Sequence, residues 1–202
     1  GKSTIINLLN RFYGIQSGRI SIDGHNINAL SLKGLRSHIA VVLQDVFLFA
    51  DTIENNISLG NSEVSLSEIE AAAKEIGVHD FIESLPGGYQ FNVKERGGML
   101  SSGQRQLIAF LRAYVTKPSI LVLDEATSSI DSASEQLIQK ATDTITKGRT
   151  SIVIAHRLAT IQKASNILVM DAGVIVERGT NEALLKKGGY YKNLYEAQFL
   201  SV

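Results

Sequence analysis

Three short apolar runs constrain the fold of this chain more than any other feature. They are "IAVVLQ" at 39–44, "SILVLDE" at 119–125 and "TSIVIAH" at 150–156. Each run is continuous, mostly β-branched and closed by polar residues, which is typical of strands in a parallel sheet that is covered on both faces. An open α/β sheet binds its ligand at the carboxyl ends of its strands. The polar residues at those ends therefore mark a candidate binding edge: Gln44, Asp124, Glu125 and His156.

The rest of the chain alternates helical periodicity with hairpin signals. The spacing of apolar residues predicts a helix that begins at or just after Lys2 and stops at Gly14, with Phe12 on its apolar side. We predict a helical subdomain at about residues 45–118, where helical patterns dominate. Residues 18–27 and 166–179 read as antiparallel hairpins, and two short helices separated by Gly188 and Gly189 close the chain.

The first four residues, Gly1, Lys2, Ser3 and Thr4, match the end of the phosphate-binding pattern G-x-x-x-x-G-K-[ST]. The free N–H groups and the dipole of a helix N-terminus favour an anion there. Lys2 can reach terminal phosphates and the Ser3 hydroxyl can bind Mg²⁺. A capped helix start is the plain alternative for so short a motif. The glycines and strand that belong before it would lie upstream of Gly1, so we expect a chain that begins inside its phosphate loop.

Two adjacent carboxylates follow the second apolar run. Two adjacent like charges at the edge of a core lower the stability of the fold. A metal-binding or catalytic role therefore explains Asp124 and Glu125 better than a structural one. Asp124 can hold Mg²⁺ directly or through water, and Glu125 can orient the water that attacks a γ-phosphate. Strand ends often carry one acid for structural reasons, but that does not explain two.

A second helix start is predicted at "LSSGQ", residues 100–104. Ser101 reads as an N-cap, and Gly103 lets the backbone approach a ligand, so this helix end can also receive a phosphate. An ordinary capped helix is again the alternative.

Taken together and in this order, these motifs resemble the nucleotide-binding domain of ABC transporters, over essentially the whole chain. The resemblance implies one ATP-binding domain over 1–202. Its fold would be α/β and P-loop NTPase-like: a mostly parallel sheet flanked by helices, with a helical subdomain and antiparallel β pieces. The motifs would be the end of Walker A at 1–4, the Q-loop at Gln44, the signature at 100–104, Walker B at 120–125, the D-loop at 128–131 and the switch histidine His156.

The resemblance also implies cofactors, a partner and a role for each motif. ATP and Mg²⁺ would bind, and two such domains, identical or different, would face each other head to tail. Ser101, Gly103 and Gln104 would complete the partner's ATP site. Gln44 would contact Mg²⁺ and the attacking water, His156 would contact the γ-phosphate, and Asp131 would help join the two sites.

Two stretches resemble the exporter type within that family. In "QDVFLFADTIENNI", residues Phe47 to Phe49 would help form the groove that receives a coupling helix of the membrane domain, although core packing is the alternative for either Phe. In "KERGGMLSSGQ", Glu95 to Gly97 match the loop before the signature, although a solvated ion pair would look the same. Lys94 stands where that loop often has glycine, and Ser102 replaces the first signature glycine. In a glycine-type backbone conformation Ser102 would be strained by up to about 3 kcal/mol.

Net charge and hydropathy narrow the functional classes to which the chain can belong. Lys plus Arg equal 20 and Asp plus Glu equal 20, so no basic footprint for nucleic acid is present. The chain has no Cys, and its apolar runs fall far short of the roughly 20 residues that span a bilayer. The resemblance then implies an ATPase cassette, itself soluble, at the cytoplasmic face of a membrane, which would power export through a transmembrane domain on the same full-length chain. The alternatives are an ABC-type ATPase acting on nucleic acid or the ribosome, and a non-catalytic truncated cassette that binds ATP weakly.

Overall fold

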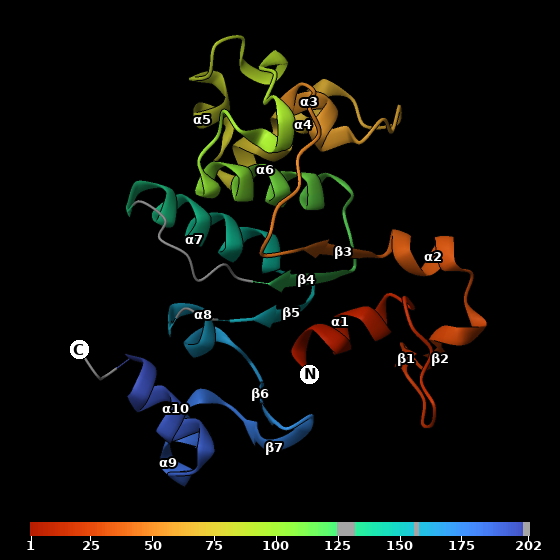
Figure 1. Cartoon of the computed structure of the whole chain (residues 1–202), viewed down its shortest axis with the longest axis vertical. Helices are drawn as coiled ribbons and strands as arrows, with labels where there is room; N and C mark the ends of the chain where they lie inside the picture. The colour runs from red at the N-terminus through yellow and green to blue at the C-terminus, as the bar shows by residue number, and fades with distance from the viewer. Residues whose placement is uncertain (125–131, 156–157, 200–202) are drawn as a thin grey trace. The chain divides into compact units, whose positions relative to one another are not determined.

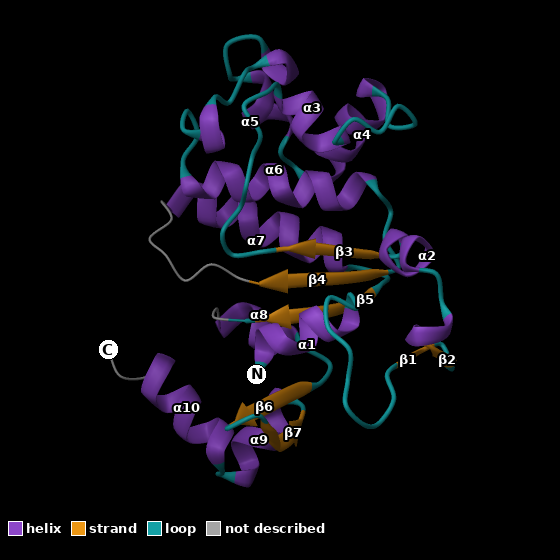
Figure 2. Cartoon of the chain, turned by 45° about the vertical axis from the view of Figure 1, so that its right-hand side comes forward, coloured by secondary structure: helices purple, strands orange, loops and turns teal. Residues whose placement is uncertain are grey.

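The computed structural model of the protein describes residues 1–124, 132–155 and 158–199. The chain forms two compact units, one from residues 31–153 and one from residues 1–30 with 154–202. Each unit has its own helices, and each is considered by itself below. Figures 1 and 2 show the elements of both.

A three-stranded sheet forms from the three apolar runs that are predicted to carry the candidate binding edge. Its strands are β3 (Ile39–Val42), β4 (Ile120–Asp124) and β5 (Thr150–Ile154), in the order β3-β4-β5. β3 and β4 are parallel, with Val42 opposite Leu123, and the arrow of β5 points the same way in Figure 1. Residues 120–123 are buried, as the prediction of a sheet covered on both faces requires. The parallel sheet predicted from the three apolar runs is thus confirmed.

Helices build most of the core of the 31–153 unit. They are α2 (Leu32–Ser37), α3 (Ile53–Ser58), α4 (Leu66–Ile76), α5 (His79–Glu83), α6 (Ser102–Val115) and α7 (Ser132–Thr146), with short 3₁₀ turns η2 (Gly88–Gln90) and η3 (Glu95–Gly97). Helix α6 is the centre of the packing, because it contacts α3, α4, α7 and β3. Its side chains Leu107, Ile108, Phe110 and Leu111 are almost fully buried. This helix therefore joins the sheet to the helices beyond it.

The unit of residues 1–30 and 154–202 contains smaller elements. They are α1 (Lys2–Leu9), β1 (Ser21–Ile22), β2 (His25–Asn26), η1 (Ile27–Ala29), α8 (Leu158–Lys163), β6 (Ile167–Asp171), β7 (Val174–Gly179), α9 (Asn181–Lys187) and α10 (Tyr190–Phe199). Both predicted hairpins form, β1 with β2 and β6 with β7. Asp23 and Gly24 have φ of 49° and 81°, the left-handed pair that a tight hairpin turn needs. The two closing helices, separated by Gly188 and Gly189, are also confirmed.

Helix α1 begins at Lys2 as predicted but ends before the predicted Gly14. It stops at Leu9, and Phe12 lies beyond it with 58% of its surface exposed, so the assignment of Phe12 to an apolar helix face is wrong. Arg11 takes a left-handed φ of 52°, and the N–H groups of Arg11 and Phe12 donate to the carbonyls of Leu8 and Asn7. This is the Schellman ending of a helix, with arginine where glycine is usual.

The predicted helical subdomain at 45–118 contains α3, α4, α5 and α6. Its bounds remain a prediction. In the described ranges, no helix combines the length and the apolar composition that crossing a bilayer requires.

Candidate nucleotide-binding site

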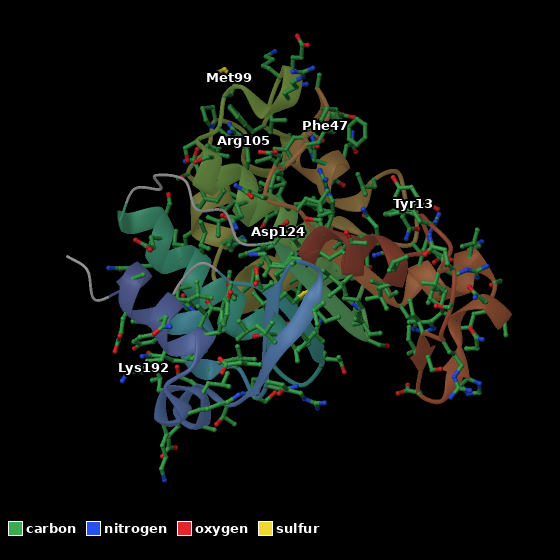
Figure 3. All side chains as sticks on the ribbon, turned by 60° about the horizontal axis from the view of Figure 1, so that its bottom comes forward. Tyr13, Phe47, Met99, Arg105, Asp124 and Lys192 are labelled. Atoms are coloured by element: carbon green, nitrogen blue, oxygen red, sulfur yellow. The ribbon has the colours of Figure 1, made fainter. Side chains whose placement is uncertain are left out.

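The carboxyl edge of the parallel sheet carries two of the predicted site residues. Asp124 is the last residue of β4 and is half-buried, and Gln44 follows β3 by two residues and is exposed. Because β3 and β4 are parallel and Val42 pairs with Leu123, the residues that follow the two strands leave the sheet at the same edge. Asp124 is labelled in Figure 3. A carboxylate and a carboxamide at one strand edge are suitable ligands for Mg²⁺ and its waters.

The first turn of α1 carries the predicted phosphate-binding residues. Gly1 is the N-cap and gives no side-chain cap, and Lys2, Ser3 and Thr4 are exposed in the first turn. The N–H groups of such a turn have no partners within the helix. An anion can therefore bind there with the Lys2 ammonium close by. These first-turn residues belong to the unit of residues 1–30 and 154–202, whereas Asp124 and Gln44 belong to the unit of residues 31–153.

The signature stretch forms a capped helix start, as predicted. Gln104 donates its N–H to Ser101 Oγ at 3.2 Å, and Ser101 donates its N–H to Gln104 Oε1 at 2.9 Å. Arg105 Nη1 donates to the Leu100 carbonyl at 2.7 Å, which fixes the residue before the cap. Ser101 is exposed while Gly103 is buried on the helix. The first turn of α6 is therefore capped at both polar groups of the box and presents Ser101 to solvent.

The two departures from the family pattern have different structural outcomes. Ser102 is the first residue of α6 and is not among the described residues with positive φ, so the strain considered for it does not arise. Lys94 has φ 61° and ψ −173°, a region that essentially only glycine occupies. The Lys94 N–H donates to Asn92 Oδ1 at 2.9 Å, which helps hold this conformation.

The predicted aromatic segment, residues 47–49, lies at the surface of the 31–153 unit. Phe47 and Phe49 are 55% and 53% exposed, and their rings meet edge to face with centroids 5.1 Å apart (Figure 3 labels Phe47). Leu48 between them is fully buried. The segment borders an open cavity of about 1210 Å³ that is also lined by Leu43, Leu59 and Arg112. Two exposed aromatic rings beside a groove are typical of a protein-docking surface.

Asn56 and Arg112 support this segment, and sequence reasoning missed both. Asn56 is fully buried on α3, and Arg112 on α6 is half-buried, so that desolvation lowers the pKa of its guanidinium. Arg112 interrupts the apolar run "IAFLRAY" and Asn56 follows the apolar Ile53 by three residues. A polar residue at a predicted core position was the signal that could have found them.

The histidines and acidic residues of the described part give no metal cluster. No group of three His, Cys, Asp or Glu side chains comes together among residues 1–124, 132–155 and 158–199. The Nδ1 of His79 instead hydrogen-bonds the hydroxyl of Tyr89 at 2.9 Å. A Mg²⁺ held by one carboxylate, a hydroxyl and substrate phosphates needs no such cluster. Within the 31–153 unit, the Asp124 carboxylate and the Gln44 carboxamide are oxygen ligands of the kind that such an ion takes.

Three predicted site residues lie outside the described residues: Glu125, Asp131 and His156. Their assignments stay predictions from the sequence. The same holds for the ligand roles of Gly1, Lys2, Ser3, Thr4, Gln44, Ser101, Gly103, Gln104 and Asp124.

Comparison with known proteins identifies the family. The model of the family described as "ABC transporter" matches residues 1–128. The chain belongs to the ABC transporter family. This membership implies ATP binding, and the fold is that of an ABC ATP-binding domain with the parallel sheet seen here.

The similar proteins are longer than this chain. An ATP-dependent lipid A-core flippase of Saccharophagus degradans is 53% identical over 98% of the chain and 34% of its own length. A probable multidrug resistance ABC transporter ATP-binding/permease protein of Bacillus subtilis is 50% identical over 98% of the chain and 29% of its own length. A solved bacterial Atm1-family ABC exporter with ATP bound matches with a TM-score of 0.89 and 44% identity, over 98% of this chain and 35% of that one. The present chain thus spans about a third of the length of these relatives.

Proposed function

We propose that this chain is the ATP-binding and ATP-hydrolysing cassette of an exporter, and that its cycle powers transport across a membrane. The observation that carries the proposal is the similarity of 98% of the chain to an ATP-bound exporter, at a TM-score of 0.89. The relatives are named as a flippase and as multidrug resistance proteins, which does not favour an ATPase that acts on nucleic acid or the ribosome.

The proposed chemistry is transfer of the γ-phosphoryl group of ATP to water. The first-turn N–H groups of α1 and the Lys2 ammonium bind and orient the phosphates. Glu125, next in sequence to Asp124 at the sheet edge, holds the attacking water and accepts its proton. The water oxygen bonds to the γ-phosphorus while the bond to the bridging oxygen breaks, so ADP and phosphate leave.

Metal binding in this proposal uses oxygen ligands from three segments. Ser3, Asp124 and Gln44 would hold Mg²⁺, either directly or through water. When bound, the ion neutralises charge on the β- and γ-phosphates. His156 would contact the γ-phosphate, and Gly1 and Thr4 would complete the loop around the phosphates.

The proposed assembly is a head-to-tail pair of cassettes, identical or different. The exposed Ser101 at the capped start of α6, with Gly103 and Gln104, would complete the ATP site of the partner, and Asp131 would help join the two sites. The segment of Phe47 to Phe49 and its groove would receive the membrane-spanning part of the exporter. The length of the relatives supports a membrane-spanning part on the same polypeptide.

Substitution of Glu125 tests the catalytic assignment. In the exporter that carries this cassette, Glu125→Gln should lower ATP hydrolysis at least about 100-fold, because the water loses its proton acceptor. ATP-driven pairing of the cassettes should persist. The matched control is Glu135→Gln, which changes an exposed glutamate on α7 and should leave hydrolysis unchanged. Full turnover in Glu125→Gln would contradict the assignment.

A further inference from the structure

The aromatic segment of residues 47–49 is held from within by one buried amide. Asn56 Oδ1 accepts the Phe49 N–H at 2.8 Å, and Asn56 Nδ2 donates to the Phe49 carbonyl at 3.0 Å. The same Nδ2 donates to the Thr52 carbonyl at 2.9 Å. One fully buried side chain therefore fixes both polar groups of the Phe49 backbone.

Arg112 ties this arrangement to α6. Its Nε donates to the Asn56 carbonyl at 2.7 Å and its Nη2 donates to Asn56 Oδ1 at 3.2 Å. Its Nη1 donates to the Phe47 carbonyl at 3.1 Å. The guanidinium thus bonds α3 and the aromatic segment at once, across 56 and 65 residues of sequence.

The residue types suit a rigid link more than a generic packing role. Asparagine is needed because its carboxamide both accepts and donates at Phe49. Arginine is needed because its donors are fixed in a plane, whereas a lysine ammonium is a point charge on a flexible stem. Burying a cation against carbonyl oxygens is costly in itself, and a merely structural contact does not require it.

The far end of α6 is the signature start. Ser101 and Gln104 cap the helix, and Arg112 lies two turns further along its continuous 14 residues. We infer that Asn56 and Arg112 are positioning residues that make the aromatic segment and the signature helix move as one body. The inference rests on the proposed function, in which the segment meets the membrane-spanning part and Ser101 meets the partner's ATP. Movement at one contact is then passed to the other.

The first test uses the chain itself and does not depend on transport. Arg112→Lys and Asn56→Asp each remove at least one bond from the link. Amide hydrogen exchange at Phe49 should speed up by about tenfold or more, whereas exchange at Ile108 and Leu111 in the core should not change. The matched control is Tyr89→Phe, which removes a partly buried hydrogen bond to His79 in the same unit and should leave exchange at Phe49 unchanged. Unchanged exchange at Phe49 in both variants overturns the inference.

The second test measures coupling in the exporter, with a compound that stimulates its ATPase. In Arg112→Lys, the ratio of stimulated to unstimulated hydrolysis, and the transport per ATP hydrolysed, should fall by about fivefold or more. Tyr89→Phe should keep both. Parallel loss of stimulated and unstimulated hydrolysis, or full stimulation in a folded Arg112→Lys, overturns the inference. If the unsubstituted protein hydrolyses no ATP, the proposed function fails instead, and the exchange test still decides whether the link exists.

Discussion

Lys94 occupies a backbone region that side chains avoid. Its φ of 61° and ψ of −173° bring the Cβ close to the backbone, at a cost on the order of 1–3 kcal/mol. The residue precedes the turn η3 and the signature helix, where Gly97 is equally constrained. A Cβ at Gly97 would lie 2.9 Å from Leu48 Cδ1 and 3.0 Å from Arg105 Cδ. The loop before the signature thus runs through three positions with positive φ, Lys94, Arg96 and Gly97, and only the last of them is glycine.

Lys94→Gly should therefore stabilise the protein. Removing the side chain relieves the strain, and the entropy that glycine loses on folding offsets part of the gain, so we expect unfolding to cost about 1 kcal/mol more. Urea unfolding of the chain measures this difference. Lys94→Ala keeps a Cβ and serves as the control, with no gain expected. A Lys94→Gly variant no more stable than Lys94→Ala would show that the strain is relaxed in solution.

At the level of elements, local signals predicted where helices begin better than where they end. The capping box at Ser101 and Gln104 is a short-range pattern, so the start of α6 could be read from four residues. The end of α1 could not, because it depends on a distant partner. Arg11 Nη1 donates to the carbonyls of Ile27 and Leu30 at 3.0 and 2.7 Å, and these bonds support its left-handed backbone. Helical periodicity carries no information about such contacts.

Two equivalent caps allow stability and function to be separated. Ser65 caps α4 with Glu68 as Ser101 caps α6 with Gln104, and both serines are exposed. Ser65→Ala and Ser101→Ala should each lower the unfolding free energy by about 1 kcal/mol, measured by urea unfolding. In the exporter only Ser101→Ala should reduce ATP hydrolysis, by about tenfold, because only that hydroxyl would also bind phosphate. Equal ATPase activity in the two variants would mean that Ser101 is a cap alone.

At the level of the whole molecule, the sequence predicted which candidate residues lie at strand ends and helix starts, because both are set locally. Gln44 and Asp124 share one edge as the parallel pairing of their strands requires. Asn56 and Arg112 could not be placed, because each acts through a bond to a segment far away in sequence. Whether two cassettes share their sites, as proposed, is decided by an experiment on the assembly.

Mixed assemblies decide whether each ATP site is built from two cassettes. Lys2→Ala removes the cation of the Walker segment and Ser101→Arg blocks the signature, so exporters made of either variant alone should retain no ATP. If the signature acts on the partner's site, a pair combining one cassette of each kind has one intact site and should retain about one ATP per pair after gel filtration. A pair with both substitutions in one cassette and none in the other should then retain no ATP, because each site has one defective half. The reverse result, with ATP kept only by the second pair, would mean that each cassette completes its own site and would contradict the head-to-tail assembly.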